Sequence, residues 1–130
     1  MYLLSYYEDR DFVEASLGGI ISTAELQIFE EELLEVIDGL GGRHFNLMLD
    51  YSRAKFSDAN SHDKLNHARE KCLQHGAARI VSVVPGQSDI ERETAYRLEA
   101  VLQGYEDYVL DPAYAQFTSL ASNAVIRKAA

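Results

Sequence analysis

The stretch HFNLMLDYSRAKFSDANS, residues 44–61, decides the fold class of this chain. It contains the run Leu47-Met48-Leu49, which is apolar on both faces of a strand and therefore predicts a central strand, residues 44–50, that is covered on both sides. Ser57 or Asp58 then has a side chain suited to cap a helix. The stretch therefore predicts a buried strand followed by a helix, the alternation typical of α/β proteins.

The alternation continues downstream. The helix that begins after Ser57 or Asp58 is expected to reach about Gln74, and Gly76 ends it. Residues 78–84, ARIVSVV, predict the next buried strand. The expected inward side chains of the helix are Leu65, Ala68, Cys72 and Leu73.

A third helix, a short strand and a last helix follow. Ser88 and Glu91 have the spacing of a capping box, in which a hydroxyl and a carboxylate bond to free backbone N–H groups. Residues 108–110 predict a strand, and Asp111-Pro112 opens a final helix expected over residues 112–127. The third helix is expected to turn inward Ile90, Leu98, Val101, Leu102 and Tyr105.

Upstream, the chain opens with a hairpin. Residues 2–7, YLLSYY, are rich in residues that favour strands, and the polar turn EDRD follows. A second strand over residues 12–17 is expected to be broken by Gly18-Gly19. Its inward side chains are predicted to be Val13, Ala15 and Leu17.

The first helix is expected to begin after Ile21. Ser22 and Glu25 have capping-box spacing, and Gly41-Gly42 end the helix. Apolar residues recur every three or four positions and predict a buried stripe: Leu26, Phe29, Leu33, Val36, Ile37 and Leu40. Four acidic residues are expected mostly away from that stripe: Glu30, Glu31, Glu32 and Glu35.

The resulting order is β-β-α-β-α-β-α-β-α. Strands that alternate with helices predict an α/β fold with a mainly parallel sheet, right-handed crossovers and an N-terminal antiparallel hairpin. The length of 130 residues suits one domain, residues 1–130.

The net charge of −9 limits the partners that the chain can bind. Ten acidic residues and one basic residue lie within residues 1–38, and the rest of the chain is balanced. Because a phosphate-backbone binder needs clustered Lys and Arg, this charge argues against nucleic acid and anionic membranes. No secretory signal or membrane-spanning run is recognised, so a cytoplasmic location without membrane insertion is expected.

The residue patterns of common catalytic and cofactor sites do not occur in the sequence. His62 and His67 are five residues apart, so they do not share a helix face, and no zinc-ligand spacing is present. Cys72 lies on an inward stripe, which predicts a buried, inert thiol. We therefore expect no metal, no cofactor and no enzymatic activity, with a weak site that combines His62 or His67 with Asp58 as the enzymatic alternative.

Two stretches resemble the STAS domain, the fold of bacterial anti-sigma-factor antagonists. In residues 12–37, Thr23-Ala24-Glu25-Leu26 match the family's entry into its first helix. In residues 47–61, Asp50-Tyr51-Ser52 match the end of its buried strand, and Asp58 matches the start of its second helix. The resemblance is greatest to divergent SpoIIAA-like and STAS/SEC14-like members, and it implies a bacterial signalling module.

The resemblance covers about residues 2–120 but fails at one functional position. In the regulatory members of the family, a serine after the conserved aspartate accepts a phosphate group and so changes the affinity for a partner. Here that position is Ala59, followed by Asn60, so the switch cannot operate there. Ser57 and Ser61 flank the position as possible substitutes.

The resemblance and the absence of catalytic motifs favour a non-enzymatic regulatory module that binds a protein. The partner would be an anti-sigma-type kinase or another regulator. The expected binding surface is the loop of residues 52–61 and the second helix, a patch of mixed charge that suits specific recognition. Its residues are Ser52, Arg53, Lys55, Asp58, Asn60 and His62.

Two further hypotheses remain open. The first is a carrier of a small hydrophobic ligand or lipid, of STAS/SEC14-like type, because Tyr and Phe are frequent along the strands. The second is a homodimer formed through the edge of residues 2–7 rather than through the acidic first helix, where residues 30–35 of two copies would repel.

Overall fold

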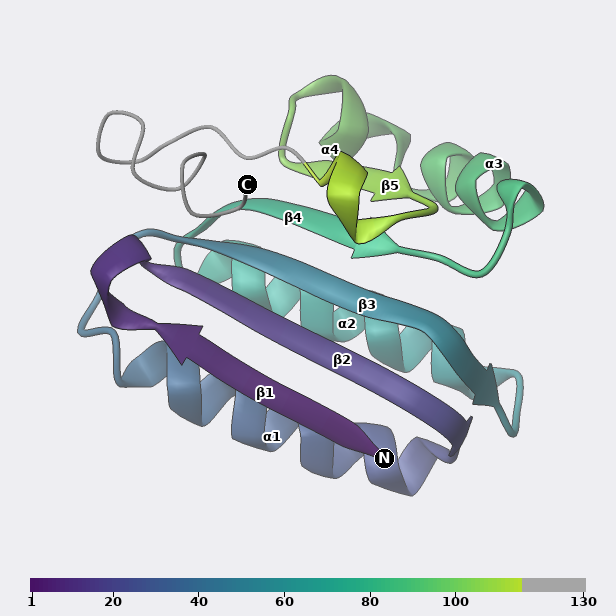
Figure 1. The fold of residues 1–130 in the computed structure, drawn as a ribbon, viewed down its shortest axis with the longest axis horizontal. Helices are drawn as coiled ribbons and strands as arrows, with labels where there is room; N and C mark the ends of the chain where they lie inside the picture. The colour runs from purple at the N-terminus through teal and green to yellow at the C-terminus, as the bar shows by residue number, and fades with distance from the viewer. Residues whose placement is uncertain (116–130) are drawn as a thin grey trace.

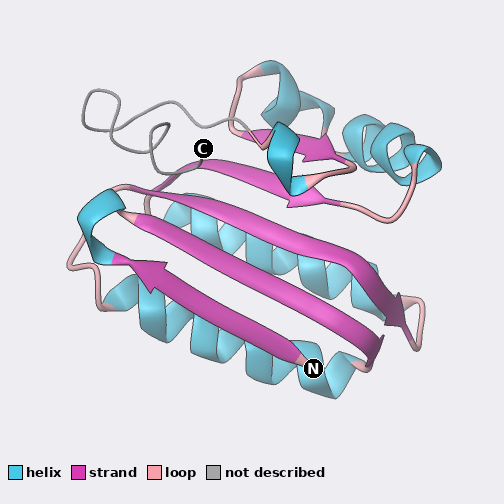
Figure 2. Ribbon diagram, in the orientation of Figure 1, coloured by secondary structure: helices cyan, strands magenta, loops and turns pink. Residues whose placement is uncertain are grey.

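The computed structural model describes residues 1–115, which form five strands, four α-helices and two 3-10 helices (Figures 1 and 2). In chain order they are β1 (Tyr2–Tyr7), η1 (Glu8–Arg10), β2 (Phe12–Ile21), α1 (Thr23–Asp38), β3 (Phe45–Phe56), α2 (Asn60–Gln74), β4 (Ala77–Val83), α3 (Gln87–Tyr96), α4 (Leu98–Leu102), β5 (Glu106–Val109) and η2 (Pro112–Tyr114).

The strands form one sheet in the order β1-β2-β3-β4-β5, which confirms the predicted α/β fold. β1 and β2 are antiparallel, and every later neighbour is parallel. The predicted final helix lies outside the described residues from residue 116 onward. In the described residues the predicted helix is replaced by the short 3-10 helix η2, which the Asp111 side chain caps by accepting a hydrogen bond from the backbone N–H of Ala113, and which ends where Ala115 is extended, with φ −68 and ψ 117.

The connecting helices lie on one face of the sheet, and α1 and α2 are seen behind it in Figure 1. β2 to β5 are neighbours in chain order, so right-handed crossovers all step the same way and place their helices on the same side. The expectation that β3 is covered on both sides is therefore not met within residues 1–115. On that strand, Leu47 and Leu49 are buried towards the helices, whereas Met48 and Asp50 are half-buried.

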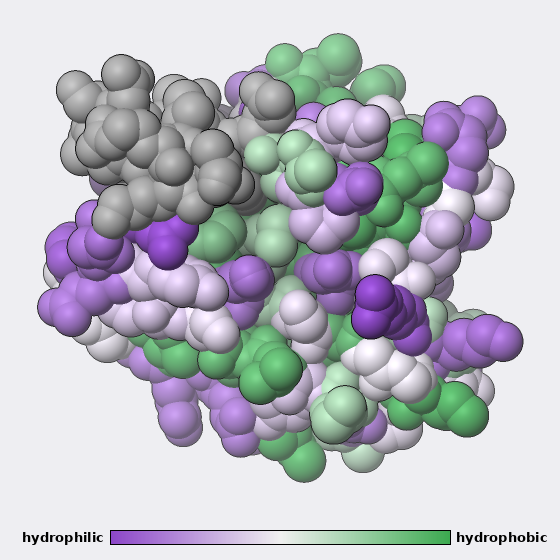
Figure 3. Space-filling view, viewed as in Figure 1, coloured by the Kyte–Doolittle hydropathy of each residue, from purple (hydrophilic) through white to green (hydrophobic). Residues whose placement is uncertain are grey.

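Between the sheet and the helices lies the main core. The predicted inward faces are confirmed for β2, for most of α1 and for Leu65, Ala68 and Cys72 of α2. The opposite face, seen in Figure 3, mixes hydrophilic and hydrophobic side chains outside the grey residues. A smaller cluster there joins Val81 to Phe12, Met48, Val109 and Ala115.

The pair β2–β3 is longer than predicted. β2 continues through Gly18 and Gly19 to Ile21, so the expected strand break there is wrong. Gly19 has φ +78, a conformation that glycine adopts without a steric penalty, and the ladder of pairs with β3 keeps the chain extended. β3 pairs with β4 only as far as Asp50, so its last residues pair with β2 alone.

Two predictions for the third helix are also wrong. Gly86 is the N-cap of α3 and no side chain caps the helix, so Ser88 and Glu91 form no capping box. The helix is divided at Arg97, whose φ of −110 and ψ of 31 end α3 before α4 begins. As a result three residues expected inside, Leu98, Leu102 and Tyr105, are exposed.

Candidate functional site

Asp58 joins the starts of α1 and α2. The Thr23 hydroxyl donates to its carboxylate at 2.7 Å, and the backbone N–H of Asn60 donates to it at 3.0 Å. These hydrogen bonds, that of Thr23 above all, lower the pKa of Asp58. Because Ala59 already has helical angles, Asp58 acts as the cap predicted for α2, one residue before the helical hydrogen bonds begin.

The two stretches that carry the family resemblance therefore meet in space. Thr23 belongs to the first stretch and Asp58 to the second, 35 residues away, and a direct hydrogen bond connects them. A carboxylate at a helix start is also favoured by the helix dipole. The junction is thus a fixed corner of the molecule, formed by β3, residues 57–59 and two helix starts.

Most of the residues predicted to bind a partner lie around this corner, on a strand rather than a loop. β3 extends to Phe56, so Ser52, Arg53 and Lys55 are strand residues and the loop before α2 spans only residues 57–59. The Ser52 hydroxyl and backbone N–H both donate to Asp50, at 2.7 and 3.0 Å. Arg53 and Lys55 are exposed and have no ion pair among residues 1–115.

The two possible phosphate acceptors differ in access. Ser57 is exposed, like Ala59 and Asn60. Ser61 is fully buried, and its hydroxyl lies 3.4 Å from the Asp58 carboxylate. Of the two hydroxyl groups, only that of Ser57 faces solvent.

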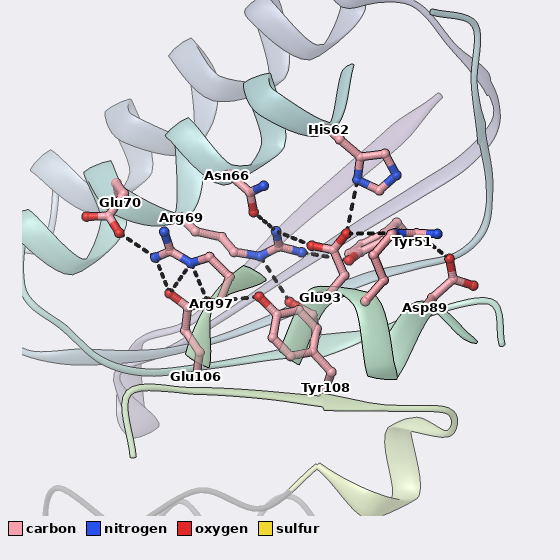
Figure 4. A network of polar contacts seen from close by, with 12 residues as sticks. Tyr51, His62, Asn66, Arg69, Glu70, Asp89, Glu93, Arg97, Glu106 and Tyr108 are labelled. Atoms are coloured by element: carbon pink, nitrogen blue, oxygen red, sulfur yellow. Dashed lines mark hydrogen bonds and ion pairs between the residues drawn. The ribbon is translucent and has the colours of Figure 1, made fainter. Parts of the chain in front are cut away.

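His62, the last predicted partner-binding residue, turns towards α3 (Figure 4). Its Nδ1 lies 3.3 Å from Oε1 of the buried Glu93, and its ring packs edge-on against Phe56 with 5.3 Å between centroids. Glu93 also lies within 3.6 Å of Arg92 and 3.8 Å of Arg69. His62 therefore links the corner to a buried polar network.

The centre of this network is Arg69, whose side chain is completely buried (Figure 4). It donates to the Tyr51 hydroxyl at 2.7 Å, to Asn66 at 2.5 Å and to the Ser82 hydroxyl at 3.3 Å. The guanidinium also lies 5.2 Å from the ring centroid of Tyr108, within the range of a cation–π contact. The network joins α2 to β3, β4 and β5.

Arg97 forms the other half of the network, at the break between α3 and α4. Two of its nitrogens contact the buried Glu106, at 3.1 and 2.5 Å, and it also pairs with Glu70 of α2. The Tyr108 hydroxyl donates to Glu106 at 2.9 Å, and burial is the main reason that the pKa of Tyr108 is raised. Arg97 thus pairs with Glu106 at the residue where the backbone leaves the helical conformation and α3 ends.

The sequence reading missed Arg69, although a signal was present. Ser61, Leu65, Arg69 and Cys72 follow one another at spacings of four and three, so Arg69 lies on the same inward stripe as the predicted core residues. A long charged side chain at such a position indicates a buried ion pair. Its partners cannot be found by spacing, because they come from other elements.

The remaining candidates have structural partners. His67 contacts Glu30 at 2.8 Å, and Glu30 is therefore buried, against the expectation that it faces outward. Cys72 is buried as predicted, and burial raises the pKa of its thiol to about 12. Within residues 1–115, no group of three or more His, Cys, Asp or Glu side chains is placed to hold a metal ion, and no helix is long and apolar enough to cross a membrane.

A hollow of about 460 Å³ lies beside the strand residues that the sequence predicted to bind a partner. It is lined by the first residues of the chain, by Ser16–Gly18 of β2, by Pro112, and by Asp50, Ser52 and Arg53 of β3. Its volume is within the range of small-molecule sites, roughly 300–1,000 Å³.

This order of strands and helices defines the STAS-like class of α/β folds. The described fold is similar to that of SpoIIAA, an anti-sigma factor antagonist. The Bacillus cell fate determinant SpoIIAA in its phosphorylated form matches with a TM-score of 0.56 and 13% identity, over 84% of this chain and 91% of that one. The unphosphorylated form matches with a TM-score of 0.55 and 13% identity, over 98% and 97% of the two chains.

No protein-family model and no curated protein matches the sequence. At 13% identity the similarity to SpoIIAA shows the fold alone. It confirms the resemblance in fold that residues 12–37 and 47–61 predicted.

Proposed function

We propose that this chain is a non-enzymatic regulatory module that binds a protein partner at the corner formed by the end of β3 and the start of α2. The observation that carries the proposal is the hydrogen bond from Thr23 to Asp58, which joins the starts of α1 and α2 at this corner of a SpoIIAA-like fold. A surface whose groups are already bonded in place has less conformational entropy to lose when it binds a partner.

The surface at the corner has mixed polarity. Arg53 and Lys55 project from the strand without ion pairs among the described residues, and Asp58 and Asn60 are exposed beside them. Exposed charges that lack partners within the molecule are available for complementary charges on another protein. The partner is a regulator of the anti-sigma kinase type or a related signalling protein, with acidic groups placed to meet Arg53 and Lys55.

Binding is not switched by phosphorylation at the usual serine position, because Ala59 has no hydroxyl group. Ser57 is the exposed hydroxyl next to Asp58, whereas Ser61 is buried. The module therefore binds its partner constitutively, is regulated through that partner, or is switched by phosphorylation of Ser57 in place of the usual position.

A pull-down with quantitative mass spectrometry tests this proposal. The bait variants are Arg53→Glu and Lys55→Glu, and Lys71→Glu is the matched control, because it reverses a charge at the far end of α2. The expected result is a partner that is recovered with the wild type and the control and lost with both test variants. Identical recovery with all four baits would exclude binding at this corner.

A second candidate function is a carrier of a small hydrophobic ligand. The hollow of about 460 Å³ favours it, since Met1 and Leu3 supply apolar lining and Arg53 supplies a cation for an acidic head group. Native mass spectrometry of the protein purified from its own host tests this function. A retained ligand supports it, and the mass of the bare chain counts against it.

A further inference from the structure

A second hollow, of about 510 Å³, lies near the end of α2 that is far from the corner. Its apolar lining comes from Leu73 of α2, Ala77 of β4 and Ala100 of α4, and the side chains of Tyr96 and Tyr105 border it. It shares no described lining residue with the hollow of about 460 Å³. Its volume is within the range of small-molecule sites, roughly 300–1,000 Å³.

Hydrogen bonds between several elements hold this hollow in place. The backbone N–H of Tyr105 donates to the carbonyl of Ala100 at 2.9 Å, and this turn keeps Tyr105 beside α4. Arg97, which also lines the hollow, pairs with Glu70 of α2 and Glu106 of β5 on either side of its guanidinium (Figure 4). A ligand therefore meets a hollow that is already formed, which lowers the entropic cost of binding.

The charge at the hollow is negative. Arg97 is the one cation among its described lining residues, and the carboxylates of Glu70 and Glu106 already offset that charge. Glu99 adds a third carboxylate, which is exposed and forms no ion pair within residues 1–115. Arg79, two residues along β4 from the lining, is paired with a carboxylate of its own at 3.2 Å. The hollow therefore repels an anion and attracts a cation.

Two exposed tyrosines supply the second feature of a cation site. Tyr96 and Tyr105 are 66% and 47% exposed, and neither hydroxyl has a hydrogen-bond partner among the described residues. An ammonium or guanidinium group within about 6 Å of the centre of such a ring is attracted to the ring face. A carboxylate beside the rings adds a charge-assisted hydrogen bond to the same cation.

We propose that this hollow binds an organic cation, a guanidinium or ammonium group on a short apolar body. The charged group meets Glu99 and the two tyrosine rings, and the apolar body packs against Leu73 and Ala100. A free small molecule or the arginine or lysine side chain of a protein supplies this chemistry. The inference does not rest on the proposed function, because Glu70 at the hollow lies ten residues along α2 from Asn60 at the corner, roughly 15 Å away.

Titration of the full chain, followed through its backbone amides by NMR, tests the proposal. The probes are agmatine, a free guanidinium compound, and acetyl-arginine amide, which represents a protein side chain. Both are expected to cause saturable shifts at Leu73, Ala100 and Tyr105. Acetyl-citrulline amide has nearly the shape of the second probe without its charge, and it is expected to bind at least about tenfold more weakly.

The two cationic probes also distinguish the source of the ligand. Tighter binding of agmatine identifies a free small molecule, whereas tighter binding of acetyl-arginine amide identifies a protein side chain. Inorganic phosphate is the control for charge, and it is expected to cause no saturable shift at the hollow, because the carboxylates there repel it.

Variants at exposed positions test the two features separately. Glu99→Gln is expected to raise the dissociation constant of agmatine about fivefold, and Glu91→Gln, an exposed position of α3 outside the hollow, is its control. Tyr96→Leu is expected to raise it about threefold. Tyr114→Leu is the matched control, because Tyr114 is 67% exposed and lies outside the hollow. Circular dichroism verifies that each variant is folded.

Three results would overturn the proposal: no saturable shift with either cation, equal binding of the citrulline probe, or equal effects of Glu99→Gln and Glu91→Gln. Shifts at the corner around Asp58 in place of the hollow would also overturn it. Arg53→Glu is expected to abolish partner binding in the pull-down and to leave the dissociation constant of agmatine within about twofold. The proposed function and this inference can therefore fail separately.

Discussion

Replacing Arg69 by methionine tests the interpretation of the buried network most directly. The side chain is fully buried and donates three hydrogen bonds, to Tyr51, Asn66 and Ser82. Methionine has a similar length and removes both the charge and the donors. It also leaves the buried Glu93 without the nearby guanidinium, which lies 3.8 Å away.

The expected loss of stability depends on which buried groups lose a partner when Arg69 is replaced. Removing one member of a buried ion pair typically costs about 3–5 kcal/mol, because the other charge stays in a medium of low polarity. Two features moderate the loss here: the hydroxyls of Tyr51 and Ser82 can rotate, and Glu93 keeps His62 at 3.3 Å and Arg92 at 3.6 Å. We therefore expect Arg69→Met to lower the free energy of unfolding by about 3 kcal/mol.

Urea unfolding followed by circular dichroism measures this change, provided that the slope of the transition is unchanged. Arg53→Met is the matched control, because Arg53 is exposed and has no ion pair among the described residues, and its effect is expected within about 0.5 kcal/mol. A double variant with Glu93→Met is expected to lose less than the sum of the two single changes, by about 1–3 kcal/mol. If Arg69→Met is no more destabilising than Arg53→Met, the network does not hold α2 and α3 to the sheet.

Three further predictions concern single positions. Because the pKa of Asp58 is lowered in the folded protein, its charge stabilises the fold at pH values above its ordinary pKa. Asp58→Asn is therefore expected to lower the urea midpoint at pH 7. The difference in midpoint between the wild type and this variant is expected to close as the pH falls through the lowered pKa. The Cys72 thiol, with its pKa raised to about 12, is expected to react with a thiol reagent at pH 8 only after urea unfolds the protein, and fast reaction of the folded protein would contradict its burial. Gly19 has φ +78, so Gly19→Ala is expected to lower the free energy of unfolding by about 1 kcal/mol. Gly18→Ala is the control and is expected to be near neutral, because its added Cβ also meets open space and its φ is not positive. Equal urea midpoints for the two variants would refute backbone strain in Gly19→Ala.

Local signals in the sequence determined the order of strands and helices, the Ser22 cap and the inward faces of β2 and α2. A cap depends on a side chain and a backbone N–H three residues away, and a buried stripe depends on a helical repeat. Both are therefore visible without knowledge of distant partners. Asp58 could be found for the same reason, as a cap at the start of a helix.

Only the tertiary structure showed which residues of different elements pair with one another. Glycines that predict a break stay within β2 because β3 pairs with them, and the break between α3 and α4 falls at Arg97, whose guanidinium pairs with Glu106 of β5. The hydrogen bond between Thr23 and Asp58 and the burial of Arg69 likewise need groups from elements far apart in the chain. A charged or polar side chain is stable inside a protein only if it has hydrogen-bond or ion-pair partners there. The spacing of residues in the sequence does not show which distant residues those partners are.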